Sequence, residues 1–194
     1  MMDDTDHMDD NENVQWHSVT RSVHWGLALF LTFQLFSGLF VSTPDVAYFY
    51  AHEVGGLLGT LVVVIAWLWG FANEDYFFWF PWGHEGRAAI ASDVRAMFAG
   101  DLPRTGRIRG LSSFIHGLGL LAATGMALTG LVIFFVIPGG RGASAASTHY
   151  LAFTDFSVMH KALADLLWAY WFGHVGFALL HQYRGHKVLN AIFG

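Results

Sequence analysis

Long apolar stretches alternate with short polar connections along most of this chain. Four of the stretches can cross about 30 Å of hydrocarbon, which takes roughly 17–25 helical residues. Each stretch is expected to be a helix, because lipid offers the backbone no hydrogen-bond partners. The pattern therefore predicts an all-α, integral membrane four-helix bundle, with spans at Val23–Val41, Ala51–Phe71, Phe114–Ile137 and Met159–Tyr183.

Basic residues are unevenly distributed among the connections. The first connection between spans has no Lys or Arg, and the third has only Arg141. By the positive-inside rule, this asymmetry predicts that both termini and the middle connection face the cytoplasm. Eight basic residues occupy those three regions: Arg21, Arg87, Arg95, Arg104, Arg107, Arg109, Arg184 and Lys187.

The middle connection contains a short amphipathic stretch at residues 87–98. Ile90, Val94, Met97 and Phe98 fall on one helical face, which predicts a helix lying on the membrane surface. An amphipathic linker without that role is an equally good interpretation.

Composition agrees with a membrane protein and narrows its chemistry. The chain is 54% hydrophobic and 13% charged, more apolar and less charged than ordinary soluble domains. It has no cysteine, which excludes disulfides, thiolate-bound iron-sulfur clusters and covalently attached c-type haem. Six acids and no Lys or Arg lie in residues 1–13, so residues 1–15 are expected to be a disordered acidic tail before a membrane domain at 16–194.

Four histidines occupy two matching depths in the predicted spans. His160 and His174 are fourteen residues apart on one helix, about 21 Å along its axis and within roughly 40° of the same face. His24 begins the first span on the cytoplasmic side, and His52 begins the second on the outer side. These depths predict an inner pair of His24 and His174 and an outer pair of His52 and His160.

Two opposed imidazoles from neighbouring helices suit the six-coordinate iron of a haem that transfers electrons. The pairs therefore predict two haem groups stacked across the membrane. Gly38, fourteen residues after His24, would face the outer haem, although glycine is common in packed membrane helices whatever they bind. Alternatively, each histidine is a polar group satisfied by a neighbouring helix.

Two further histidines stay ambiguous. His116 starts the third span, where it would contact a haem propionate or a quinone, or serve as an interfacial polar residue. His181, seven residues beyond His174, would reach the edge of the inner haem or face lipid headgroups.

The segment SVTRSVHWGLALFLTFQLFSGLFV resembles the first helix of the bacterial cytochrome b561 family, with Arg21, His24 and Trp25 in its Arg-x-x-His-Trp opening. It is also similar to the b-type cytochrome subunits of nickel-iron hydrogenases and formate dehydrogenases. The stretches that begin at His52 and His160 resemble the second and fourth helices, and the likeness covers most of residues 16–190. One departure is Trp67, near the place where members often carry an arginine.

The resemblance implies a bacterial inner-membrane protein with two non-covalent haem b groups, ligated by the four paired histidines. It also implies electron exchange between the quinone pool and a redox partner, either within a larger oxidoreductase or alone. Some stand-alone members are implicated in oxidising superoxide with quinone as acceptor. Membrane lipid and a second copy of the chain are further expected partners, and nucleic acid is not.

Three charged side chains are candidates for roles near the haems. Arg21 shares a helical face with His24, and Arg184 follows the fourth span, so either would neutralise an inner propionate or simply obey the positive-inside rule. Lys161 would hold an outer propionate, attract superoxide, or pair with Asp165 at the i,i+4 position.

Two other classes of function compete with electron transfer. A histidine-rich transporter without haem would need a continuous polar path through the bundle. An assembly subunit would carry structural haems and dock a partner through its acidic tail. The polar residues that the spans offer for a path, besides histidines, are Thr32, Gln34, Ser37, Thr60, Thr124, Thr129 and Asp165.

Overall fold

The computed structural model describes residues 17–42, 45–103, 109–136, 148–186 and 188–193. The predicted acidic tail at 1–15 lies outside this part of the chain, as do Arg104, Arg107, Arg141 and Lys187. The described residues form helices and no strands, as expected for an all-α protein. The helices are α1 (Ser18–Gly38), α2 (Val46–Ala72), α3 (Tyr76–Trp79), α4 (His84–Phe98), α5 (Leu111–Val136), α6 (Thr148–Tyr183) and α7 (Asn190–Phe193).

Three helices in the described part of the chain are long and apolar enough to cross a membrane: α2, α5 from Leu111 to Phe135, and α6 from Thr154 to Tyr183. The predicted first span forms a helix, α1, but is not among them, because Arg21, His24 and Gln34 lower its hydropathy. The largest boundary error concerns α6, which begins at Thr148, eleven residues before the predicted start of its span.

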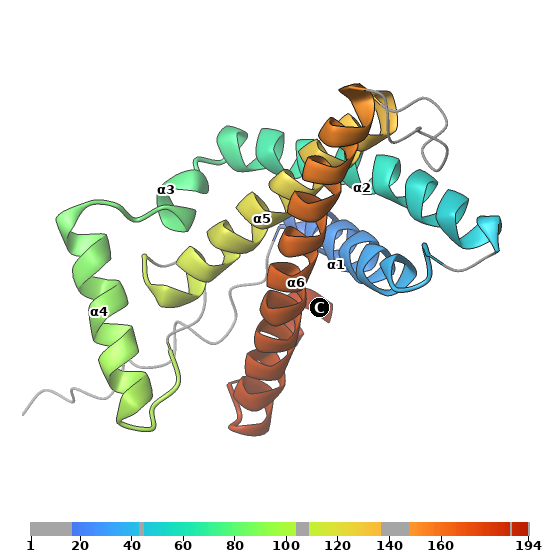
Figure 1. Ribbon diagram of the computed structural model, residues 1–194. Helices are drawn as coiled ribbons and strands as arrows, with labels where there is room; N and C mark the ends of the chain where they lie inside the picture. The colour runs from blue at the N-terminus through green and yellow to red at the C-terminus, as the bar shows by residue number, and fades with distance from the viewer. Residues whose placement is uncertain (1–16, 43–44, 104–108, 137–147, 187, 194) are drawn as a thin grey trace, which may run out of the picture.

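The long helices pack in a chain of neighbours. α1 lies against α2, α2 against α5, and α5 against α6, while α1 and α6 touch less closely. Figure 1 shows α4 standing apart from these helices, beyond the turn that carries α3. The short α3 and the longer α4 both contact α5, so the middle connection is anchored to the start of that helix.

Two clusters form the buried core. Val63 and Ala66 of α2 meet Leu120 and Ala123 of α5 in the first cluster. Leu167 of α6, which is fully buried, centres the second cluster together with residues of α1 and α5. Each helix contributes one alanine to the first cluster, and small residues of this kind let membrane helices approach closely.

Three tryptophans tie the long helices together through hydroxyl groups. The indole Nε1 atoms donate hydrogen bonds to threonine Oγ1 atoms on neighbouring helices, which satisfies both polar groups inside an apolar bundle. The bonds join α2 to α1 (Trp69 to Thr20, 3.0 Å), α2 to α5 (Trp67 to Thr124, 2.9 Å) and α6 to α1 (Trp171 to Thr32, 2.9 Å). Trp67, the departure from the family pattern, is therefore a packing residue between α2 and α5.

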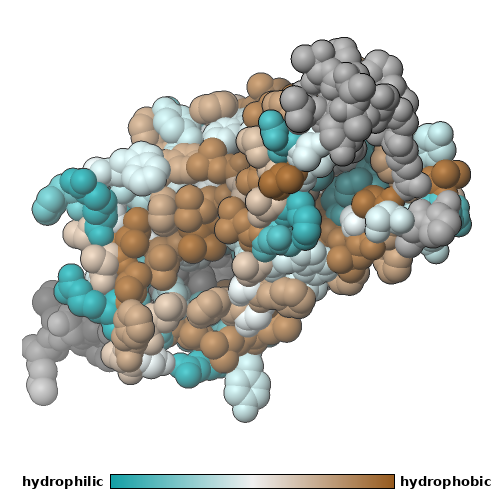
Figure 2. Space-filling model, viewed as in Figure 1, coloured by the Kyte–Doolittle hydropathy of each residue, from teal (hydrophilic) through white to brown (hydrophobic). Residues whose placement is uncertain are grey.

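The outer surface of the long helices is strongly apolar. Leu29, Leu68, Phe135 and Phe172 are each more than 60% exposed. Figure 2 shows apolar residues covering most of one face of the molecule. An apolar surface of this extent fits contact with lipid chains and not with water.

The predicted helix of the middle connection exists as α4, but its buried side chain is polar. Asp93 is 4% exposed, whereas Phe98 of the predicted apolar face is 86% exposed. Asp93 Oδ2 accepts a hydrogen bond of 2.9 Å from the backbone N–H of Leu111, the first residue of α5. A carboxylate there accepts from an N–H that has no partner within the helix. Its negative charge also interacts favourably with the positive end of the helix dipole.

We expect Asp93→Ala to lower the stability of the folded protein by about 1.5–3 kcal/mol, the usual worth of a hydrogen bond to a charged group. Thermal unfolding of the detergent-solubilised protein would measure the loss. The exposed Asp101 provides a control, since Asp101→Ala also removes one carboxylate from the middle connection but not the one that Leu111 contacts. Equal melting temperatures for the two variants would show that the cap contributes nothing.

Candidate functional site

The structure brings the four paired histidines together as the spacing predicts. The rings of His24 on α1 and His174 on α6 have centroids 6.2 Å apart. The rings of His52 on α2 and His160 on α6 have centroids 6.3 Å apart. We keep the names inner pair for the first two and outer pair for the second two, after the predicted orientation.

Both separations fit two imidazoles on opposite sides of one metal. A ligating imidazole nitrogen lies about 2.0–2.1 Å from a first-row metal, and the ring centroid lies roughly 1.1 Å further away, so two opposed rings have centroids roughly 6 Å apart. Direct hydrogen bonding between two imidazoles would bring them closer, as His181 and His186 show with centroids 5.2 Å apart and Nδ1 atoms 3.0 Å apart. The four histidines therefore have the spacing that an axial pair requires.

The outer pair is oriented by two hydroxyl groups. Ser37 Oγ of α1 lies 2.9 Å from His52 Nδ1, and Thr129 Oγ1 of α5 lies 2.8 Å from His160 Nδ1. Occupying Nδ1 leaves Nε2 of each ring as the atom available to a metal, and such outer partners fix the ring of a ligating histidine. Gln34 adds a further tie, since its Nε2 donates to the His52 backbone carbonyl at 3.0 Å.

Two glycines make room for the outer pair. A Cβ atom on Gly38 would lie 3.5 Å from His52 Cε1, and one on Gly130 would lie 3.3 Å from His160 Cε1. The distance at Gly130 is tighter than usual, so a larger residue there would press on the His160 ring, whereas the distance at Gly38 is an ordinary contact. Gly38 therefore lies beside the His52 ring, and its predicted place against the outer haem stays a prediction.

The inner pair has a third histidine beside it. The His116 ring of α5 stands perpendicular to the His174 ring, with centroids 4.8 Å apart. His116 Nδ1 lies 2.7 Å from the Ser112 carbonyl oxygen, so this nitrogen carries the proton and donates it. Sequence reasoning placed His116 at the membrane surface and missed this contact.

The three charged candidates differ in what they contact. Arg184 donates from Nη1 to the Gly100 carbonyl at 2.8 Å, which ties the end of α6 to the loop after α4. Arg21 is half-buried one turn before His24. Lys161 and Asp165 form an exposed i,i+4 ion pair at 3.4 Å, the most ordinary of the three roles considered for that lysine.

His181 was considered as a residue that reaches the inner haem or faces lipid headgroups, and the structure pairs it with another histidine. Its side chain is buried, 5% exposed, and its ring contacts His186. Among the described residues, no group of three or more His, Asp or Glu side chains could hold a metal ion.

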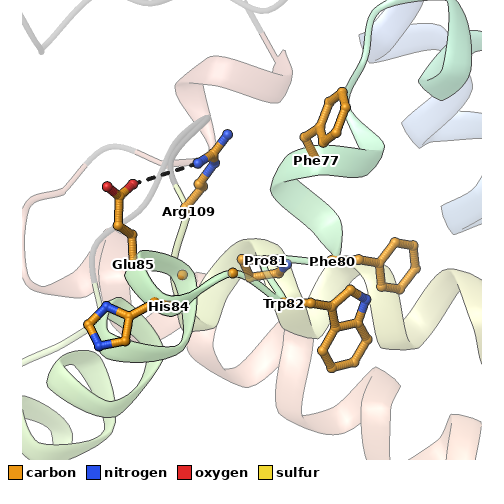
Figure 3. Close-up of a pocket in the computed structure, with 9 residues that line it drawn as sticks. Phe77, Phe80, Pro81, Trp82, His84, Glu85 and Arg109 are labelled. Atoms are coloured by element: carbon orange, nitrogen blue, oxygen red, sulfur yellow. Dashed lines mark ion pairs between the residues drawn. The ribbon is translucent and has the colours of Figure 1, made fainter.

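A cavity of about 430 Å³ lies between the α3–α4 turn and the start of α5. Figure 3 shows Phe80 and Trp82 pointing to one side of this turn while His84 and Glu85 point to the other. Arg109 pairs with Glu85 at 3.9 Å, and both side chains are largely exposed. Because these side chains do not converge, the cavity has no arrangement that suggests chemistry.

The chain was also compared with models of known protein families. The family model for prokaryotic cytochrome b561 matches residues 15–194, which is nearly the whole chain. The chain belongs to this family. It is accordingly an integral membrane cytochrome, and the family's function is transmembrane electron transfer by haem b. Neither the curated proteins nor the solved structures gave a match.

The packing of α1 against α2 holds His52 in place and can be tested at Gly55, one turn further along α2. A Cβ atom on Gly55 would overlap the ring of Phe33 and lie 2.5 Å from Gln34 Nε2, the group that binds the His52 carbonyl. We expect Gly55→Ala to destabilise the protein by about 1–3 kcal/mol through overpacking.

The measurement is thermal unfolding in detergent together with haem content. Gly173→Ala is the matched control, because nothing lies within 4 Å of a Cβ atom at that position of α6. A Gly55→Ala protein as stable as the control would contradict the tight contact between α1 and α2.

Proposed function

We propose that this cytochrome b561 holds two haem b groups, one between His24 and His174 and one between His52 and His160, and passes electrons across the membrane between them. The observation that carries the proposal is the pair of ring separations, 6.2 Å and 6.3 Å, at two levels of α6, with α1 providing the second ring of one pair and α2 that of the other. Haem b, when bound, would supply a one-electron carrier, and the paired imidazoles would be the residues that hold its iron.

The protein's own residues contribute orientation and exclusion of water. Hydroxyl groups of Ser37 and Thr129 fix the outer rings, and Gly38 and Gly130 leave those rings their space. At the inner level, His174 stacks on Tyr170 with centroids 5.4 Å apart. Arg21, on the same helix as His24, is the side chain that we propose to neutralise an inner propionate.

We further propose that α1, α2, α5 and α6 form a four-helix bundle in the bacterial inner membrane with both termini in the cytoplasm. His160 and His174 lie fourteen residues apart on α6. A helix that reaches both of these levels is long enough to be proposed as a membrane span. The exchange of electrons with the quinone pool and with a protein partner follows from the family resemblance, and the basic residues of the middle connection favour the orientation.

The polar residues of the spans count against the transporter interpretation. Each of them is already bound to a neighbouring helix, a backbone carbonyl or a charged side chain, which leaves no spare polar path among the described residues. The contacts are Thr32 with Trp171, Gln34 with His52, Ser37 with His52, Thr60 with Gly56, Thr124 with Leu120, Thr129 with His160, and Asp165 with Lys161.

Double variants distinguish the pairing from four independent histidines. Removing both members of one pair, as in His52→Ala with His160→Ala, should cost one haem of two and leave the other. Removing one member of each pair, as in His24→Ala with His160→Ala, should disturb both. Haem b per polypeptide, measured as the pyridine haemochrome, reads out the difference.

Lys161→Ala is the matched control, since it lies beside His160 but outside the pair. It should retain both haems. If the within-pair and cross-pair double variants lose the same amount of haem, the assignment of ligands to pairs is wrong.

A further inference from the structure

The outer pair and the inner pair differ in what orients the histidine on α6. At the outer level, Thr129 of α5 holds His160 Nδ1 through a hydroxyl group, which can both donate and accept. At the inner level, the residue of α5 that contacts His174 is another histidine, His116, thirteen residues before Thr129. The helix α5 thus provides one polar partner for each α6 histidine.

We propose that His116 is a positioning residue of the inner pair, and that it sets the orientation and protonation of the His174 ring. Its own Nδ1 is committed as a donor to the Ser112 carbonyl at 2.7 Å, so its Nε2 has only a lone pair to offer. In the structure the two rings are in edge-to-face contact. The proposal is that, with the inner metal bound, an N–H of His174 turns toward this lone pair while the other nitrogen of His174 faces the metal.

Geometry excludes His116 as an axial ligand opposite His174. Two imidazoles on opposite sides of one metal have centroids roughly 6 Å apart, and the 4.8 Å between these rings is too short for a metal to lie between them. His24, at 6.2 Å, satisfies that requirement. The three rings thus divide into one ligand pair and one partner.

The partner also affects the ligand electronically. An acceptor on the outer nitrogen makes a ligating imidazole more basic, which favours the oxidised metal. Losing that acceptor should therefore favour the reduced form of the inner haem. Taken as a tenfold change in the redox equilibrium, this effect corresponds to a rise of about 59 mV for a one-electron couple.

The test compares His116→Phe, which keeps a ring of similar size without an acceptor, with His116→Gln, whose amide oxygen can accept. Redox titration of the purified protein gives the two haem potentials, and low-temperature electron paramagnetic resonance gives the ligand field of each ferric haem. We expect His116→Phe to raise one potential by about 59 mV, or to lose that haem, while His116→Gln stays close to the wild type.

Thr129→Val provides the matched control at the outer level, and it should change the other haem only. The inference would be overturned if His116→Phe left both potentials and both spectra unchanged, or if His116→Phe and His116→Gln both lost all haem. It rests on the proposed function, but the two fail differently. A wild-type chain with fewer than two haems refutes the function, whereas two haems that ignore His116→Phe refute only this inference.

Discussion

The interaction on which the rest of the structure depends is the facing of two imidazole rings from different helices at each of two levels. Such a pair can hold a metal only if its two facing nitrogen atoms are about two metal–nitrogen bond lengths apart while the surrounding side chains stay packed. Apolar surroundings provide no water to satisfy the second ring nitrogen, so each paired histidine of the proposed site needs a partner inside the protein. The helix interfaces are arranged around those partners.

The polar contacts between the long helices meet this need for partners. Ser37 and Thr129 hold the outer rings, and Gln34 secures the backbone at His52. Between the two levels, tryptophan-to-threonine hydrogen bonds join α1 to α6 and α2 to α5. Apolar packing around the buried Leu167 fills the space between them. A few polar groups thus fix the helices in register without opening a polar path.

The sequence predicted the helical fold and the two histidine levels, because fourteen residues bring a helix back to nearly the same face. It did not predict that His116 lies beside His174. That contact depends on how α5 packs against α6, and the start of α5 is held by Asp93 of α4, eighteen residues before Leu111. A hydrogen bond between elements joined by a loop leaves no periodic signal. The early start of α6 was missed because polar residues after residue 148 obscure the apolar pattern.

The most direct test of the two-pair arrangement is the number of haem b groups per chain. The detergent-purified protein, expressed with ample haem, would be assayed as the pyridine haemochrome against polypeptide mass. The arrangement of His24 with His174 and His52 with His160 predicts two haems for each polypeptide. A protein that is folded and holds one haem or none would contradict it.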